Sequence, residues 1–256
     1  MKIGIIQGRL SPPTEGFQEC PSDWQREFNL LSQLNLNHIE WIVTKKSFNT
    51  NPVMIADVSK YPISSICADN LVDERITSKK YLYRNLIPIC DAAVNNSIAN
   101  VTIPLLEDSS MINDETRQVF CSLISEIIDR YETLNFLFEA ELKAGQLKEI
   151  LDLSDRCYVT YDTGNITSCG FNHLEYLEQV FDRIKNVHLK DRTFDAQTVQ
   201  PLTGDTDFEQ IFHFLKKNRY NGLYTLQTAR GKFGDEVRTI KEHKKIMETL
   251  YNEESI

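Results

Sequence analysis

The sequence predicts a single closed (β/α)8 barrel over residues 1–256, and three observations support this prediction. Short segments typical of strands alternate with segments of helical periodicity from end to end, which indicates a parallel sheet with crossover helices. Eight such units are present, and 256 residues are typical of one such barrel. No linker, low-complexity segment or short-period repeat divides the chain. A doubly wound open sheet is the alternative, because the same alternation would build it.

Each expected strand is short, rich in aliphatic or aromatic residues, and followed by a polar turn. These strands cover residues 3–7, 38–43, 62–67, 100–104, 135–139, 158–161, a seventh segment around His188, and 222–227. Apolar residues at helical spacing predict helices at 21–34, 52–60, 78–94, 113–133, 145–153, 173–184, 207–218 and 235–251.

Composition and charge exclude several classes of protein. No segment is long and apolar enough to span a membrane, and the apolar run at residues 1–7 is too short for a signal peptide. The net charge of 28 − 37 = −9 argues against a nucleic-acid partner. Six scattered cysteines without a C-x-x-C pair indicate reduced, structural thiols in the cytoplasm. A small molecule is therefore the expected partner, and a homo-oligomer is compatible with all of these observations.

Four polar side chains stand at the ends of the last four expected strands: Glu139, Asp162, His188 and Gln227. In a parallel barrel these ends meet at one rim, so we expect the four side chains to converge. Two carboxylates, an imidazole and an amide oxygen suit Mn²⁺, Mg²⁺ or Co²⁺, with Zn²⁺ as the alternative. Each side chain has a competing structural interpretation. Glu139 would be a salt-bridged strand end and Asp162 an Asx-turn into Gly164. His188 would be a buried core histidine and Gln227 a structural amide.

Five motifs in the same order resemble the xylose-isomerase-like barrels of sugar and sugar-phosphate isomerases and epimerases. They lie at residues 139–142 (Glu-Ala-Glu-Leu), 162–165 (Asp-Thr-Gly-Asn), 187–191 (Val-His-Leu-Lys-Asp), 202–208 (Leu-Thr-Gly-Asp-Thr-Asp-Phe) and 220–222 (Tyr-Asn-Gly). The resemblance covers the carboxyl-terminal half densely and the amino-terminal half more loosely, through residues 3–7 and 39–41. Together the motifs are specific, although each alone would be weak.

The resemblance implies an enzyme of carbohydrate metabolism, namely a metal-dependent sugar or sugar-phosphate isomerase or epimerase that acts through an enediolate. It implies that Glu139, Asp162, His188 and Gln227 bind the metal. It also implies that Glu139 moves the proton and that Lys190 polarises or orients the substrate.

Gln227 departs from the family pattern, which usually has a glutamate there that serves as metal ligand and often as an acid/base group. Glutamine keeps a carbonyl oxygen but has no ionisable carboxylate, so we expect weaker metal binding and no second base at this position. Aldose–ketose isomerisation through Glu139 alone survives this change, which favours isomerisation. An epimerase that uses Lys190, Glu107 or Asp69 instead stays open.

Further polar residues near the strand ends are expected to contact the substrate. They are Gln7, Arg9, Glu40, Asp69, Asn165, Arg192 and Arg230. Arg192 and Arg230 follow the seventh and eighth strands, where barrels often bind phosphate, and arginine suits bidentate contacts to oxyanions. Ordinary surface charge is the alternative for both arginines.

Two other functions stay open. The first is a catalytically impaired barrel that binds a sugar derivative, motivated by Gln227. The second is a lyase or dehydratase that uses the same metal–enediolate chemistry. An endonuclease with several zinc ions is disfavoured, because five histidines supply too few strand-end ligands and an acidic surface opposes DNA.

Overall fold

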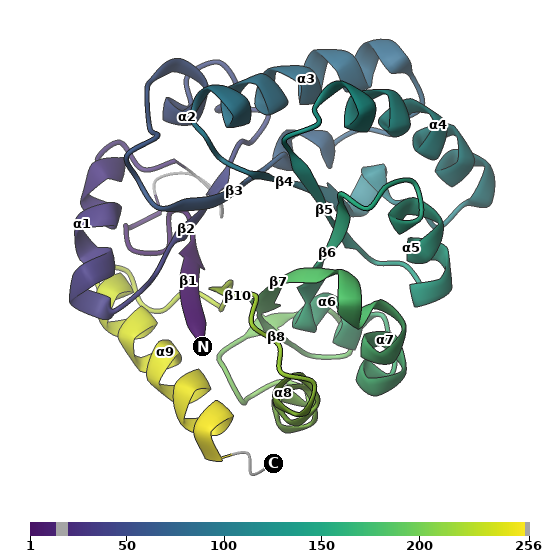
Figure 1. The fold of residues 1–256 in the computed structure, drawn as a ribbon. Coiled ribbons are helices and arrows are strands. Elements are labelled where there is room, and N and C mark those ends of the chain that lie inside the picture. Colours follow the sequence, from purple (N-terminus) through teal and green to yellow (C-terminus); the bar gives the residue numbers. More distant parts are fainter. Residues whose placement is uncertain (14–19, 254–256) are drawn as a thin grey trace.

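The computed structural model describes residues 1–13 and 20–253, and in it parallel strands close into a barrel surrounded by helices (Figure 1). The barrel strands are β1 (Lys2–Ile6), β2 (Ile39–Ile42), β3 (Ile63–Cys67), β4 (Asn100–Leu105), β5 (Asn135–Ala140), β6 (Cys157–Asp162), β7 (Ile184–Leu189) and β10 (Leu223–Leu226). They follow one another around the barrel in chain order, and β10 pairs with β1 to close it. The predicted (β/α)8 barrel is confirmed, and the open-sheet alternative is wrong.

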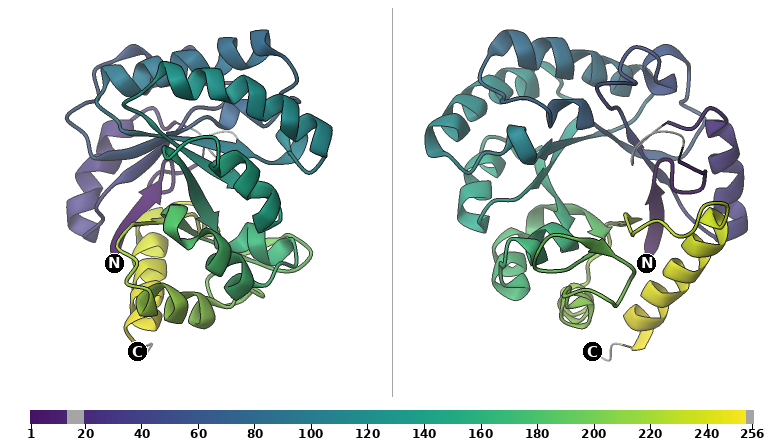
Figure 2. Two further views of the ribbon diagram at one scale, coloured as in Figure 1. Left: turned by 45° about the vertical axis from the view of Figure 1, so that its right-hand side comes forward. Right: turned by 180° about the vertical axis from the view of Figure 1, so that it is seen from behind.

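Helices form the outer layer on all sides of the strands, as the view from behind also shows (Figure 2). They are α1 (Trp24–Leu34), α2 (Pro52–Ile55), α3 (Lys79–Asn95), α4 (Asp114–Arg130), α5 (Ala144–Leu151), α6 (Thr163–Ser168), α7 (His173–Val180), α8 (Phe208–Lys217) and α9 (Glu236–Glu253). The last helix, α9, completes the ring between α8 and α1 (Figure 1). Within the described ranges, every helix is too short or too polar to cross a membrane.

The structure differs from the predicted elements mainly at the barrel mouth. The helix α6 and a small antiparallel hairpin of β8 (Asp191–Arg192) and β9 (Thr198–Val199) were not expected. The first helix begins at Trp24 rather than at residue 21, and α7 ends at Val180, where a 3-10 turn takes over. Short polar elements carry little periodicity, so only the tertiary context defines them.

Apolar side chains on the outer face of the strands pack against the helices, whereas much of the barrel interior is polar. Trp41 of β2 stacks on Phe28 of α1 with ring centroids 5.6 Å apart, which places this tryptophan in the outer core. Its neighbour Glu40 points the other way, into the barrel, because successive residues of a strand face opposite sides. Ile42 lies two residues beyond Glu40 on β2 and therefore also faces the interior. It forms an apolar cluster with Cys67 of β3 and Ile6 of β1.

His38 occupies the interior beside Gly4, and the missing side chain of this glycine makes room for the imidazole. A Cβ atom at residue 4 would lie 2.3 Å from the His38 ring. The Nε2 atom of His38 hydrogen-bonds with the Thr225 hydroxyl at 3.1 Å, and burial lowers the pKa of His38 to about 4. At neutral pH the ring is therefore an uncharged part of the packed interior.

Replacing Gly4 by alanine should displace this ring and lower the free energy of unfolding by about 1–3 kcal/mol, as overpacking of a core does. Urea unfolding followed by circular dichroism measures the change. The matched control is Gly145→Ala in α5, where a Cβ atom meets no neighbour within 4 Å, so we expect a gain of about 0.5–1 kcal/mol. Equal stability of Gly4→Ala and the wild type would show that His38 is free to move.

Candidate metal centre

Three side chains of types that can bind a metal converge at the carboxyl ends of the adjacent strands β5, β6 and β7. The Nδ1 atom of His188 lies 3.5 Å from Oε2 of Glu139 and 3.7 Å from Oδ2 of Asp162. The three potential ligand atoms all lie within 4.8 Å of one another, and all three residues are buried. One cation can contact all three atoms, and the mixture of oxygen and nitrogen ligands suits a divalent ion.

Among the buried polar atoms that lack the hydrogen bond burial normally requires, two belong to predicted metal ligands. Within the described ranges, neither Nδ1 of His188 nor Oε1 of Gln227 has a hydrogen-bond partner. Gln227 follows β10, and its backbone amide donates to the Leu189 carbonyl at 3.1 Å, which fixes it next to β7. An imidazole nitrogen and an amide oxygen that are both buried and unsatisfied fit a bound cation.

The opposite nitrogen of His188 is held by Glu40 from inside the barrel. The distance between Nε2 of His188 and Oε2 of Glu40 is 2.6 Å, and both side chains are fully buried. Glu40 also accepts hydrogen bonds from the hydroxyls of Thr102 (2.8 Å) and Ser65 (3.2 Å) and from the Asn186 amide (2.9 Å). Burial would raise the pKa of Glu40, but the charge of His188 and these donors hold it below its ordinary value. An ionised Glu40 therefore accepts from Nε2 and leaves Nδ1 to face the two acids.

Glu40 was predicted to contact substrate, and the structure instead places its carboxylate below the cluster, bonded to protein groups. The charge of Glu40 and then that of Glu139 raise the pKa of His188 well above its ordinary value, against the opposing effect of burial. Without a metal, a proton on Nδ1 would supply the positive charge between the acids. Metal binding would release that proton.

Lys190 and Asn165 surround the two acids. The ammonium of Lys190 lies 3.2 Å from Oδ2 of Asp162, and the Asn165 amide donates to Oε1 of Glu139 at 3.1 Å. Burial would raise the pKa of Asp162, but the charges of Lys190 and His188 bring it below its ordinary value. The Oδ1 atom of Asp162 also accepts the Asn165 backbone amide at the start of α6. Asp162 therefore caps a helix and faces the cluster at the same time.

The predicted substrate contacts on the loops after β1 and β10 are largely engaged with the protein. The Arg230 guanidinium donates to the carbonyls of Gly8 (2.8 Å) and Ser11 (3.1 Å), which ties the two loops together. Arg9 is buried, and desolvation together with the nearby Arg230 charge lowers its pKa to about 9. The amide oxygen of Gln7 accepts the Ile42 backbone N–H at 2.7 Å and so joins β1 to β2.

Arg192 and Asp69 lie closer to the open mouth. One Arg192 nitrogen is 3.6 Å from the Glu141 carboxylate and 3.3 Å from the Ser168 hydroxyl, so this cation already has partners. Asp69 begins a 3-10 turn directly after β3. Burial, and then the charge of Glu139, raise the pKa of Asp69 to about 7. Asp69 is therefore poised to exchange a proton near neutral pH.

Two carboxylates that hold the loops of the mouth were missed by sequence reasoning. Asp191 accepts the backbone amides of Thr203, Gly204 and Thr206 at 3.0–3.3 Å and so shapes the loop after β9. Glu27 of α1 is buried and likewise accepts backbone amides of the loop after β1. The position of Glu27 in an amphipathic helix gave no signal, because an acid there usually faces solvent.

Replacing Glu40 by glutamine should weaken divalent-metal binding about 10- to 100-fold, because the neutral amide no longer fixes the ring of His188. Calorimetric titration with Mn²⁺ measures the affinity. The histidine ¹H–¹⁵N spectrum of the metal-free protein should show a changed protonation pattern at His188. Glu141→Gln, which removes a half-buried acid bonded elsewhere, is the control and should leave affinity unchanged. Unchanged metal affinity in Glu40→Gln would contradict this positioning role.

Replacing Gln227 by glutamate should tighten metal binding, since a carboxylate replaces the neutral amide oxygen next to β7. The same titration provides the comparison, with the wild type measured at several pH values because metal binding competes with a proton. An affinity equal to that of the wild type at every pH would remove Gln227 from the metal site.

Relatives with detectable sequence similarity include inosose dehydratases. The chain is 32% identical over 105 residues to inosose dehydratase from Clostridium perfringens, with 33% of this chain and 35% of that protein covered. Identity to inosose dehydratase from Clostridium tetani is 21% over 184 residues, covering 60% and 62% of the two chains. The match therefore spans about a third of the first relative and less than two thirds of the second.

Solved structures of similar architecture include sugar epimerases. The 3-keto-D-glucoside 4-epimerase from E. coli superposes with a TM-score of 0.70 at 15% identity, covering 97% of this chain and 99% of that chain. The zinc-containing IOLI protein gives a TM-score of 0.73 at 14% identity, covering 98% and 99%. An L-ribulose 3-epimerase gives 0.73 at 12% identity, covering 98% and 94%. At these identities the likeness shows a shared fold.

The family comparison covers the part of the chain that carries the candidate metal-binding cluster. The profile of the xylose isomerase-like TIM barrels matches residues 82–250, which is more than half of the sequence. This range includes β4 to β10 and all four predicted ligands. The resemblance inferred from the sequence motifs is thereby confirmed, and the chain belongs to the family of xylose isomerase-like TIM barrels.

Proposed function

We propose that the protein is a divalent-metal-dependent sugar or sugar-phosphate isomerase or epimerase that acts through an enediolate. The observation that carries this proposal is the convergence of Glu139, Asp162 and the free nitrogen of His188 at the barrel mouth. The mouth of this fold is where active sites are built. Mn²⁺, Mg²⁺ and Co²⁺ suit the oxygen-rich ligand set, and the zinc-containing IOLI protein supports Zn²⁺ as the alternative.

The residues divide the work between metal binding and proton transfer. Glu139, Asp162 and His188 would hold the ion, with the amide oxygen of Gln227 as a further ligand. When bound, the ion would stabilise the negative charge that develops on the carbonyl and hydroxyl oxygens of the substrate. Glu139 would take the proton from the carbon next to the carbonyl. Lys190 would place its ammonium charge, now beside Asp162, near a substrate oxygen.

Asp69 is the best candidate for a second acid/base group, because Gln227 cannot serve as one. Its pKa of about 7 allows it to donate or accept a proton near neutral pH, and the charge of Glu139 acts on it directly. It follows β3, on the side of the mouth away from β6 and β7. Removal of a proton by Glu139 and its return by Asp69 would complete an epimerisation. Glu139 acting alone would give an aldose–ketose isomerisation.

Dehydration is the second candidate, and the sequence match to inosose dehydratases favours it. The first step would be the same, with Glu139 taking the proton next to the carbonyl. The bond between the next carbon and its hydroxyl would then break, and the departing hydroxyl would take a proton from the Lys190 ammonium and leave as water. This route needs one base and one acid and no second base, so Gln227 does not obstruct it.

Activity should be tested on aldoses, ketoses, their phosphates and inososes, with and without exhaustive chelation, in heavy water. We expect metal-dependent exchange of a carbon-bound proton, and Glu139→Gln should reduce it about 10²- to 10⁴-fold. Asp69→Asn should keep the exchange but lose net epimerisation. Asp73→Asn is the control for a nearby acid and should retain both.

The products separate the remaining alternatives. A product that is isomeric with the substrate identifies an isomerase or epimerase, and loss of one water identifies a dehydratase. Tight sugar binding without any exchange would favour a barrel that binds without turnover. Full turnover by Glu139→Gln, or indifference to chelation, would sink the proposal.

A further inference from the structure

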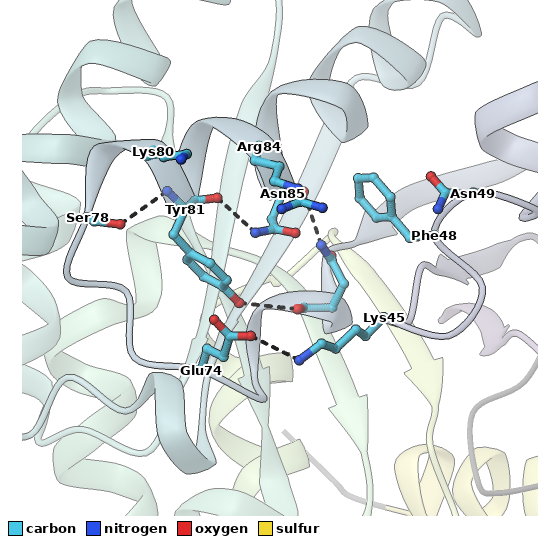
Figure 3. A pocket seen from close by; sticks show the side chains of 10 residues that line it. Lys45, Phe48, Asn49, Glu74, Ser78, Lys80, Tyr81, Arg84 and Asn85 are labelled. Atoms are coloured by element: carbon cyan, nitrogen blue, oxygen red, sulfur yellow. Dashed lines mark hydrogen bonds and ion pairs between the residues drawn. The ribbon is translucent and has the colours of Figure 1, made fainter.

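We propose that a second cavity on the same face of the barrel binds the phosphate group of a small, hydroxyl-bearing metabolite. The cavity has a volume of about 420 Å³ and lies between the loops after β2 and β3 and the start of α3 (Figure 3). Figure 3 shows Lys80 and Arg84 along α3, with Phe48 and Asn49 of the loop after β2 across from Arg84.

The charges on the first turns of α3 are arranged unfavourably for the helix itself. Lys80 and Arg84 are four residues apart and so lie on one face, where like charges destabilise a helix. Lys80 is also in the first turn, next to the positive end of the helix dipole, and this turn contains no acidic residue. A bound anion would relieve both repulsions.

The other cations of this region already have acidic partners. Lys79 pairs with Glu126 on α4, and Lys45 lies 3.0 Å from Glu74. In the part of the chain that the structure describes, no carboxylate pairs with Lys80 or Arg84. In a protein of net charge −9, Lys80 and Arg84 face one cavity, and Glu74, the acid of the described lining, is already paired with Lys45, so the cavity suits an anion.

The remaining lining suits the carbon and hydroxyl part of such a ligand. Asn70 is only 2% exposed, and its side-chain oxygen lacks a hydrogen-bond partner among the described residues. Its position is fixed, because its amide nitrogen donates to the Asn85 carbonyl at 3.1 Å. The exposed amide of Asn49, also part of the lining, offers a hydrogen-bonding group to a ligand hydroxyl. The half-buried ring of Phe48 offers an apolar surface to a sugar backbone.

A phosphate suits the cationic side of the cavity better than a neutral group does. Arginine binds phosphate oxygens through two parallel N–H donors, and lysine adds a point charge. This assignment differs from the sequence prediction of a phosphate near Arg192 and Arg230, whose guanidinium groups bond to protein oxygens.

Phosphate binding at this cavity does not require the metal centre, so the two proposals can fail separately. Asp69, the candidate second acid/base group, directly precedes Asn70, a residue of the cavity lining. A phosphorylated sugar is therefore the chemical class that would serve both places, with its phosphate at Lys80 and Arg84.

Calorimetric titration of the full chain with inorganic phosphate, glucose 6-phosphate and glucose tests this site. We expect both phosphates to bind, glucose 6-phosphate more tightly, and glucose to bind at least tenfold more weakly than its phosphate. Lys80→Gln and Arg84→Gln should each weaken phosphate binding about tenfold, the effect of losing one charge-assisted hydrogen bond. Lys241→Gln on α9 makes the same charge change elsewhere and should have no effect.

Thermal unfolding gives an independent readout with opposite signs. Without phosphate, the Lys80→Gln variant should melt at a higher temperature than the wild type, because a repulsive charge is removed. Added phosphate should raise the melting temperature of the wild type by more than that of the variant. The His188→Ala variant lacks a candidate metal ligand but should still bind glucose 6-phosphate through the phosphate group. Its affinity for glucose 6-phosphate should be at least the affinity of the wild type for inorganic phosphate. Equal effects of Lys80→Gln and Lys241→Gln, or equal affinities for glucose and glucose 6-phosphate, would overturn the proposal. Loss of metal binding with intact phosphate binding would count against the proposed catalytic function alone.

Discussion

The buried hydrogen bond between His188 and Glu40 is the constraint on which the arrangement of the mouth depends. A carboxylate without exposure to solvent is costly unless charges and donors compensate it, and here an imidazole and three neutral donors do so. Because Nε2 is used in this way, Nδ1 is the ring nitrogen that faces Glu139 and Asp162. The polar interior of the barrel thus decides which atom of His188 is offered to a ligand. It also explains why the interior is not filled with aliphatic side chains as in many barrels of this fold.

The same polar interior shows how far the sequence could predict the site. Strand periodicity and the order of motifs were enough to place Glu139, Asp162 and His188 at adjacent strand ends, since a parallel barrel brings such ends together. Depth along a strand was not predictable. Glu40 was expected to contact substrate, but the register between β1, β2 and β3 shows that it lies one layer below the mouth. A substrate contact and a support for His188 look identical in a sequence.

The cations illustrate a second limit, because sequence alone does not show which charges are already paired. Arg192 and Arg230 follow the strands that often carry phosphate sites, yet both guanidinium groups bond to protein oxygens. Lys80 and Arg84 lie in a helix whose sequence is typical of an ordinary surface helix. The structure distinguishes them from their neighbour Lys79, because Lys79 pairs with Glu126. The fold itself was easier to predict, since alternation of strands and helices is a property of the whole chain.

Charge balance offers a reason for glutamine at position 227. Glu40, Glu139 and Asp162 bring three negative charges to the centre, and Lys190 brings one positive charge beside Asp162. A divalent cation would therefore make the buried group neutral, with His188 in its neutral form. A fourth carboxylate at residue 227 would leave one negative charge in a region shielded from water, which is costly and would raise the pKa of one acid. As the proposed further ligand, the amide of Gln227 would supply an oxygen without that cost. In the proposed site Lys190 would balance the third carboxylate, which leaves a neutral ligand as the favourable choice for residue 227.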